Sequence, residues 1–139
     1  MAFEFAYRLS GGEPTIQDLT FKDTETLTKG DLVNLETGEI DLAATNDEAL
    51  VGVALETKAG TDSTTKLKVI TDADAVYSVT DANARLIGAT LDVAGATGAQ
   101  TVETSSNKEL VCVATVSATE PTLVSIIQAR HWFAGTASA

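Results

Sequence analysis

Cysteine and histidine are nearly absent from this 139-residue chain, which has one residue of each. A single cysteine cannot form an internal disulfide, so the stability of the fold must come from core packing or from partner subunits. A zinc site built from one cysteine and one histidine would depend mostly on carboxylates. These shortages argue against a disulfide-stapled scaffold and against a zinc protein.

Positive charge is also scarce, with 9 Lys and Arg residues against 20 Asp and Glu residues and a formal net charge of −11. Nucleic acids and anionic membrane surfaces attract clustered Lys and Arg, so neither is an expected partner. No apolar run approaches the roughly 18 residues of a membrane span. The N-terminal segment lacks the basic start of a signal peptide. We therefore expect synthesis in a cytoplasm and no contact with membranes.

Groups that carry out catalysis are missing as well. Cys112 lies between two valines in an apolar run, which is typical of a small buried hydrophobic residue. His131 has no neighbouring nucleophile or orienting acid, and the glycines do not follow the order of a phosphate-binding loop. Asp72 and Asp74 lack the glycine and the distal glutamate of a calcium loop. The sequence therefore predicts a protein that is not an enzyme and that has no cofactor or metal site.

A repeated apolar segment is the most informative feature that is present. Residues 49–56 read ALVGVALE, and residues 109–116 read ELVCVATV. The identities are those of Leu50, Val51, Val53 and Ala54 with Leu110, Val111, Val113 and Ala114. Each run follows turn-forming residues and has few polar interruptions, which is typical of a strand buried on both faces. We therefore expect two similar β-units, each built around one central buried strand, that share a core.

Alternating apolar and polar residues predict further strands. Residues 31–43 predict a hairpin in which Leu35 faces Ile40 across a two-residue turn at positions 37–38. Residues 66–69 alternate lysines with apolar residues, which predicts a strand with one solvated face. Aromatics make up only 5% of the chain, but threonine and valine favour strands, and the many turn residues imply numerous short elements.

One segment has the pattern of a helix. Residues 80–88, TDANARLIG, begin with capping residues and end with Gly88 at the position of a left-handed C-terminal cap. No linker divides the chain into two domains. The sequence thus predicts a mainly-β fold: a single small β-barrel or sandwich of two similar β-units over residues 16–139, with one short helix.

Aromatic residues gather at the two ends of the chain. Phe3, Phe5 and Tyr7 alternate, so in an extended segment their rings would project to one side. Residues 1–15 then form either an extended N-terminal arm that docks on a partner or a first strand that closes on its own core, and both interpretations stay open. The candidate partner-contact residues at the two ends are Phe3, Phe5, Tyr7, Arg8, His131, Trp132 and Phe133.

The order of these features resembles that of the capsid decoration, or cement, proteins of tailed bacteriophages. The resemblance rests on a KGDLVNL strand at residues 29–35, a TGEI turn at residues 37–40, the ALVGVALE run, and a KLKVI strand at residues 66–70. It is strongest over residues 28–70 and weaker through the second apolar run at residues 109–115.

The resemblance implies a β-rich domain, commonly trimeric, that sits on the outer surface of the virion capsid and bridges neighbouring subunits of the major capsid protein. The expected partners are therefore the major capsid protein lattice and other copies of this chain, which is made in the host cytoplasm. The family's N-terminal segment often reaches onto the lattice or onto a neighbouring subunit. The alternative is another virion or appendage β-module that binds a receptor or a carbohydrate, for which residues 131–133 are the only aromatic cluster.

Overall fold

The computed structural model describes residues 2–22, 25–44, 49–60, 65–104 and 107–132. Within these ranges the chain forms thirteen strands and one 3₁₀ turn, η1 (Gln128–Arg130). The strands are β1 (Phe3–Arg8), β2 (Ile16–Thr20), β3 (Thr26–Leu27), β4 (Leu32–Glu36), β5 (Glu39–Leu42), β6 (Leu50–Val53), β7 (Lys58–Ala59), β8 (Lys66–Ile70), β9 (Ala75–Val79), β10 (Thr90–Ala94), β11 (Thr101–Thr104), β12 (Leu110–Cys112) and β13 (Thr122–Ile126).

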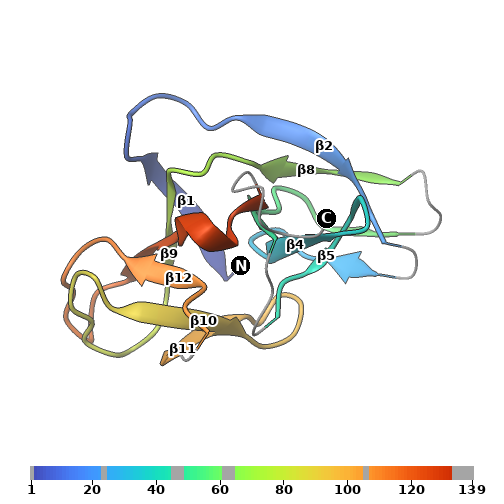
Figure 1. Cartoon of the computed structure of the whole chain (residues 1–139). Helices are drawn as coiled ribbons and strands as arrows, with labels where there is room; N and C mark the ends of the chain where they lie inside the picture. The colour runs from blue at the N-terminus through green and yellow to red at the C-terminus, as the bar shows by residue number, and fades with distance from the viewer. Residues whose placement is uncertain (1, 23–24, 45–48, 61–64, 105–106, 133–139) are drawn as a thin grey trace.

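The strands form four antiparallel sheets (Figure 1). The largest sheet has the order β1-β9-β13-β12-β10-β11, and a three-stranded sheet has the order β5-β4-β6. Two ribbons, β2-β8 and β3-β7, complete the described part of the fold. Each strand order in this part of the chain is open, so no sheet closes into a barrel. The predicted mainly-β fold is confirmed, and its layers pack face to face as in a sandwich.

The three-stranded sheet lies between two hydrophobic clusters. On one side, Leu50 and Val53 of β6 join the larger cluster on the inner face of the six-stranded sheet. On the other side, Val51 and the following Ala54 pack with residues of β8 and of the segments around β2 and β3. All residues of β6 are therefore buried, as the first apolar run predicts.

The second apolar run has only one buried face. Leu110 and Cys112 of β12 are buried, but Val111 and Val113 are half-buried, and Val113 follows the end of the strand. The prediction of near-complete burial is wrong for these two valines. The reason is the position of β12: it belongs to a sheet that packs on the core with one face, whereas β6 lies between two clusters.

The predicted hairpin forms with the predicted register. Leu35 pairs with Ile40, and Val33 pairs with Leu42. The turn residues Thr37 and Gly38 have φ angles of 52° and 81°, which is the pair of positive φ values that a type I′ turn requires. Strand β8 also follows its alternating pattern, with the two lysines exposed and the apolar residues buried.

The helix predicted over residues 80–88 does not form. Arg85 and Val116 instead exchange backbone hydrogen bonds of 3.0 and 2.9 Å as an isolated antiparallel bridge. The carboxylate of Asp81 accepts a 2.6 Å bond from Arg85 Nε, and Ala82 has a φ of 60°, which a right-handed helix does not allow. Short polar side chains that bond nearby groups compete with helix formation, and here they hold a loop.

Two buried polar side chains join the halves of the chain. The carboxylate of the buried Asp31 accepts hydrogen bonds from the backbone amides of Thr28 and Gly98, both at 2.8 Å. The buried Gln100 accepts a 2.7 Å bond from the Leu32 amide and donates a 3.1 Å bond to the carbonyl of the same residue. These bonds fix the loop between β10 and β11 against the start of β4, so the two halves pack as one body.

Strand β1 is an edge strand of the six-stranded sheet, so the structure shows a first strand that closes on its own core. Phe3 pairs with Val79, is fully buried, and donates its backbone N–H to the Gly30 carbonyl at 2.9 Å. A β-bulge between Phe5 and Tyr7 shifts the register, so that the Tyr7 side chain projects from the opposite face of the sheet to Phe3 and Phe5. The expectation that all three rings share one side is therefore wrong, because Tyr7 lies on the outer face.

Candidate interaction surface

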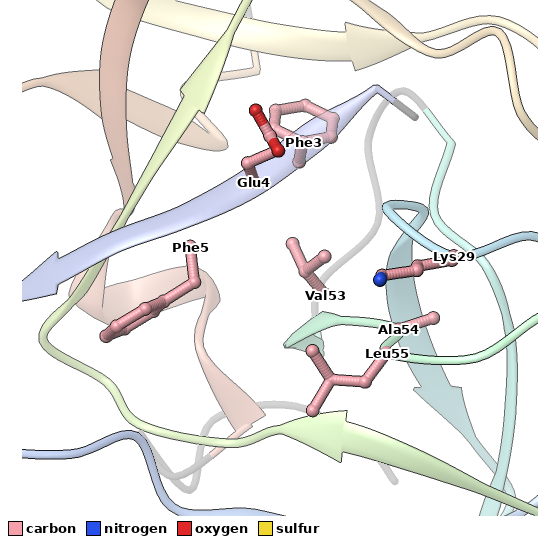
Figure 2. A pocket seen from close by; sticks show the side chains of 7 residues that line it. All are labelled: Phe3, Glu4, Phe5, Lys29, Val53, Ala54 and Leu55. Carbon is pink, nitrogen blue, oxygen red and sulfur yellow. The ribbon is translucent and has the colours of Figure 1, made fainter.

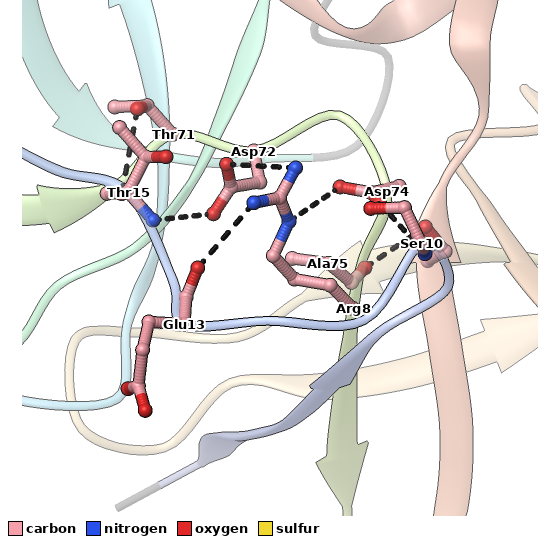
Figure 3. Close-up of polar contacts among 9 residues, drawn as sticks. Arg8, Ser10, Glu13, Thr15, Thr71, Asp72, Asp74 and Ala75 are labelled. Carbon is pink, nitrogen blue, oxygen red and sulfur yellow. Dashed lines mark hydrogen bonds and ion pairs between the residues drawn. The ribbon is translucent and has the colours of Figure 1, made fainter.

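Arg8, one of the candidate contact residues, lies in an internal ion-pair network (Figure 3). Its guanidinium is placed between two carboxylates, donating from Nε to Asp74 at 3.0 Å and approaching Asp72 at 3.6 Å. Asp74 also accepts hydrogen bonds from the backbone and hydroxyl of Ser10, and Asp72 accepts one from the Thr15 amide at 2.6 Å. The network ties the connection between β1 and β2 to the turn before β9.

The network also perturbs the ionisation of its members. The hydrogen bond from the Ser10 hydroxyl, with smaller contributions from the Ser10 amide and Arg8, lowers the pKa of Asp74 to about 2. In turn, the hydrogen bond to Asp74 raises the pKa of Arg8 above its usual value. Arg8 is therefore a charged residue that is already paired within its own chain.

A small pocket lies beside the start of β1 (Figure 2). It has a volume of about 170 Å³ and is lined by Phe3, Glu4, Phe5, Lys29, Val53, Ala54 and Leu55. Phe5 is half-buried and packs against the edge of the larger cluster. Figure 2 shows the Lys29 ammonium directed toward Val53, so this pocket combines apolar side chains with the charged Lys29 and Glu4.

Of the three C-terminal aromatic candidates, the structure describes His131 and Trp132. His131 is buried and forms a parallel bridge with Leu50, and burial lowers the pKa of its imidazole. Trp132 is half-buried and packs against the second hydrophobic cluster, with its ring centroid 6.4 Å from that of His131. Phe133 lies outside the described residues. The two described side chains stabilise the fold and do not form an exposed aromatic platform.

A larger apolar groove lies on the outer face of the six-stranded sheet. We call it the sheet groove; it has a volume of about 480 Å³ and is lined by Leu9, Ala73, Asp74, Val111, Val113, Ser125, Ile126, Ile127 and Gln128. Val111 and Val113 are the outward residues of the second apolar run, and Leu9 is 60% exposed. Because the aliphatic side chains outnumber the charged ones, this groove is suited to an apolar partner group.

A loop with two exposed aliphatic side chains lies next to strand β12. Leu86 is 72% exposed and Ile87 is 66% exposed, and we call these two residues the loop tip. The Ile87 amide donates to the Thr115 hydroxyl at 3.0 Å, and the Gly88 amide donates to the Cys112 carbonyl at 2.8 Å. Adjacent large apolar residues in solvent are costly unless a partner covers them.

The loop tip stands on a rigid base. Arg85 and Asp81 form an ion pair of 2.6 Å that leaves little of either side chain in solvent. Burial alone would raise the pKa of Asp81, but hydrogen bonds from Arg85 and Asn83 outweigh it and lower that pKa. The loop therefore presents its apolar residues in a fixed geometry.

Sequence reasoning did not identify the loop tip or the sheet groove. Leu86 and Ile87 belong to the segment predicted as a helix, and that prediction did not mark either of them as exposed. The groove depends on which strands become neighbours. Among the predicted contact residues that the structure describes, only Tyr7 is exposed on the outer face. Two consecutive large aliphatic residues before a glycine in a polar segment were the available signal.

Two other kinds of site are not found among the described residues. No group of three or more His, Cys, Asp or Glu side chains in this part of the chain is arranged to hold a metal ion. The described segments also contain no helix with the length and apolar character that a membrane crossing needs.

Comparison with known proteins adds a fold relationship. Neither a protein-family model nor a curated protein sequence matches the chain. A solved structure that matches is the N base of the head fiber gp8.5 of bacteriophage phi29, with 17% sequence identity and a TM-score of 0.52. The match covers 84% of this chain and 98% of that chain. This chain therefore shares its fold with the base of a phage head fiber.

Proposed function

We propose that this protein is a structural component of a bacteriophage virion and acts as a capsid decoration, or cement, protein on the outer surface of the mature capsid. The observation that carries the proposal is the fold shared with the phi29 head fiber base over 84% of this chain and 98% of that chain. The order of strand motifs in the sequence independently resembles that of decoration proteins. Both relationships lead to proteins of the phage head.

The physical character of the chain supports a binding role without catalysis. Such a protein needs a stable folded body and exposed contact surfaces, and the loop tip and the sheet groove supply two. Its net charge of −11 would keep coated particles apart in solution. The same contact repeated by capsid symmetry turns weak individual binding into strong total binding.

Stabilisation of the capsid would follow from binding that bridges neighbouring subunits. A protein that binds the assembled lattice, and not the separated subunits, shifts the equilibrium toward the lattice by mass action. The major capsid protein and other copies of this chain, in a trimer, are the proposed partners. Neither nucleic acid nor membrane is needed for this role.

The proposal is tested with expanded, undecorated shells of the phage that encodes this chain. Purified protein is mixed with the shells and sedimented, and the shells are then heated while light scattering follows their disruption. A cement protein co-sediments and raises the disruption temperature. Failure to co-sediment at saturating concentration would contradict the proposed capsid role.

A second candidate function is the base of a head fiber or other appendage, which the phi29 neighbour itself favours. A fiber base attaches to the capsid but has no need to bridge neighbouring capsid subunits. Co-sedimentation without any rise in the disruption temperature would therefore favour the fiber base over the cement protein.

A further inference from the structure

We infer that the outer face of the six-stranded sheet docks a basic partner protein, through a segment whose aliphatic side chains are flanked by lysine or arginine. The inference deepens the proposed function, on which it rests for the identity of the partner: the segment belongs to the capsid surface and not to another copy of this chain. The docking surface consists of the sheet groove, the loop tip and three carboxylates around them.

The centre of the docking surface is apolar and continuous. Val111 and Val113 line the sheet groove, and the Val113 amide donates to the Leu123 carbonyl at 3.0 Å, which places the half-buried Leu123 beside them. The loop tip adjoins the same strand, because the Gly88 amide donates to the Cys112 carbonyl at 2.8 Å. The two residues of the loop tip are the most exposed large hydrophobic residues of the described chain. Contiguous apolar surface of this kind marks an interaction site.

The loop tip is already ordered for binding. The ion pair of Asp81 with Arg85 and the backbone bridge from Arg85 to Val116 hold the loop beneath it. A contact segment that is fixed in advance loses little conformational entropy when a partner covers it. The loop tip can therefore serve as one wall of a binding site without a folding step.

Exposed carboxylates stand at the rim of this apolar centre. Side chains alternate between the two faces of a strand, so Glu4 and Glu103, which follow the core residues Phe3 and Val102, project on the outer face. They lie on β1 and β11, the two edge strands of the sheet. Glu120 lies in the connection between β12 and β13. All three are exposed, and none forms an ion pair within the described part of the chain; we call them the rim carboxylates.

Three arginines near this face are already engaged within the chain. Arg8 is paired with two aspartates, and Arg85 is paired with Asp81. Arg130, which follows the groove segment, donates to the Asn107 carbonyl at 2.7 Å. The positive charges beside the groove are thus committed to internal contacts, whereas the rim carboxylates are left for a partner.

Charge selects a basic partner as the occupant. Two copies of this chain carry −11 each, and a contact between their outer faces would bring the rim carboxylates together. A partner with lysine or arginine around an aliphatic segment would instead pair with the rim while its apolar side chains fill the groove. This is the ordinary arrangement of a protein interface, with an apolar centre, a polar rim and complementary charge. Each contact can be weak, because the capsid repeats it by symmetry.

The first test uses two blocked synthetic peptides and no capsid. Both have the same centre of leucine and valine, which is flanked by lysines in one peptide and by glutamates in the other. Each is titrated into the isotope-labelled parent chain, and amide chemical shifts are followed by NMR. The lysine peptide is expected to shift the signals of β12, β13 and residues 85–88, and the glutamate peptide to bind at least about tenfold more weakly. Equal binding of the two peptides, shifts confined to other parts of the chain, or no binding of the lysine peptide at millimolar concentration would overturn the inference.

The second test removes the apolar part of the surface and measures co-sedimentation with expanded, undecorated shells. The variant Leu86→Ser/Ile87→Ser is expected to bind at least about tenfold more weakly, which corresponds to about 1.4 kcal/mol. Its thermal midpoint should not change, because both side chains are exposed. Ile16→Ser, which removes an exposed aliphatic residue from β2, is the matched control and should bind as the parent chain does.

The third test removes the charged part of the surface. Replacement of the three rim carboxylates by glutamine is expected to weaken shell binding roughly fivefold, as for the loss of three exposed ion pairs. It should also flatten the salt dependence of binding between about 0.1 M and about 1 M, where the screening length falls from about 10 Å to about 3 Å. The control replaces three carboxylates on β2, β4 and β5, by Asp18→Asn, Glu36→Gln and Glu39→Gln, and changes the net charge equally. Equal effects of the two triple variants would show that only net charge matters and would overturn the role of the rim.

The outcomes separate this inference from the proposed function. If the parent chain binds shells and the double serine and rim variants bind equally well, the inference is overturned and the proposed function stands. If the lysine peptide binds the outer face but the parent chain does not bind shells, only the proposed function is contradicted. A free parent chain that light scattering shows to be an oligomer, and that the double serine change dissociates, would assign the face to a second copy and overturn the inference.

Discussion

The effect of truncating the Phe3 side chain distinguishes between two interpretations of the N-terminal segment, a core strand and a docking arm. Phe3 is fully buried in the larger hydrophobic cluster, pairs with Val79, and anchors its amide on the Gly30 carbonyl. Removing a buried phenylalanine ring costs about 3–5 kcal/mol, because transfer free energy is lost and a cavity remains. We expect Phe3→Ala to lower the free energy of unfolding by that amount, which corresponds to a fall of roughly 10–20 °C in thermal midpoint for a chain of this size.

The measurement is urea unfolding followed by tryptophan fluorescence at one fixed protein concentration, since association also changes apparent stability. Tyr7→Ala is the matched control, because Tyr7 lies on the same strand but is 44% exposed on the outer face. It should cost about 1 kcal/mol or less. Equal, small losses from both variants would refute the assignment of β1 to the core and return the segment to the role of an arm.

Three further predictions concern single positions. Gly52→Ala should destabilise the fold by about 3 kcal/mol or more, because a Cβ there would lie 1.8 Å from the Ile70 carbonyl oxygen, as thermal unfolding would show. Asp74→Asn should flatten the loss of stability between about pH 4 and pH 2, since the Ser10 bonds hold the native pKa of Asp74 at about 2, below the 3.8 of an ordinary aspartate. Thr37→Asn should add about 0.5–1 kcal/mol, because asparagine tolerates the positive φ of the hairpin turn, and urea unfolding measures the gain.

Matched variants make these predictions falsifiable. Gly88→Ala has a strained φ but no atom near its Cβ, so it should cost far less than the Gly52 change, and equal costs would contradict the steric argument. Glu103→Gln removes an exposed carboxylate and should leave the acid limb of the stability curve unchanged. An acid limb that is also unaltered in Asp74→Asn would contradict the role given to the Ser10 bonds. If Thr37→Asn instead lowers the free energy of unfolding, the threonine side chain must make a stabilising contact that asparagine does not replace.

The parts of the fold with local signals were predictable from sequence. The hairpin formed with Leu35 opposite Ile40 because its turn and its alternation both lie within a dozen residues. Strand β6 was predicted as buried on both faces from an apolar run alone, and the structure places it between two clusters. In these cases propensity, pattern and packing agree.

The errors arose where distant contacts decide the local structure. Residues 80–88 carry helix caps, but the backbone bridge from Arg85 to Val116 holds them in a loop. Val111 repeats a buried position of the first apolar run but lies on the open face of a different sheet. Sequence similarity between the two runs could not reveal this difference, since burial depends on which layers pack against each strand.

The candidate site was predictable only in small part. Tyr7 was chosen as a contact residue and is exposed, but Phe3 and His131 were chosen for the same aromatic character and are buried. An aromatic side chain near a terminus has equal reason to fill a core or an interface. Leu86 and Ile87 are visible as an apolar pair in the sequence, but their exposure follows from the loop that Asp81 and Arg85 build.

The most direct test of the central claim is electron cryomicroscopy of expanded, undecorated shells incubated with this protein. The account predicts added density at symmetry-related positions on the outer surface, into which copies of this β-sandwich fit with contacts to neighbouring capsid subunits. Shells that remain bare at saturating protein concentration would contradict it.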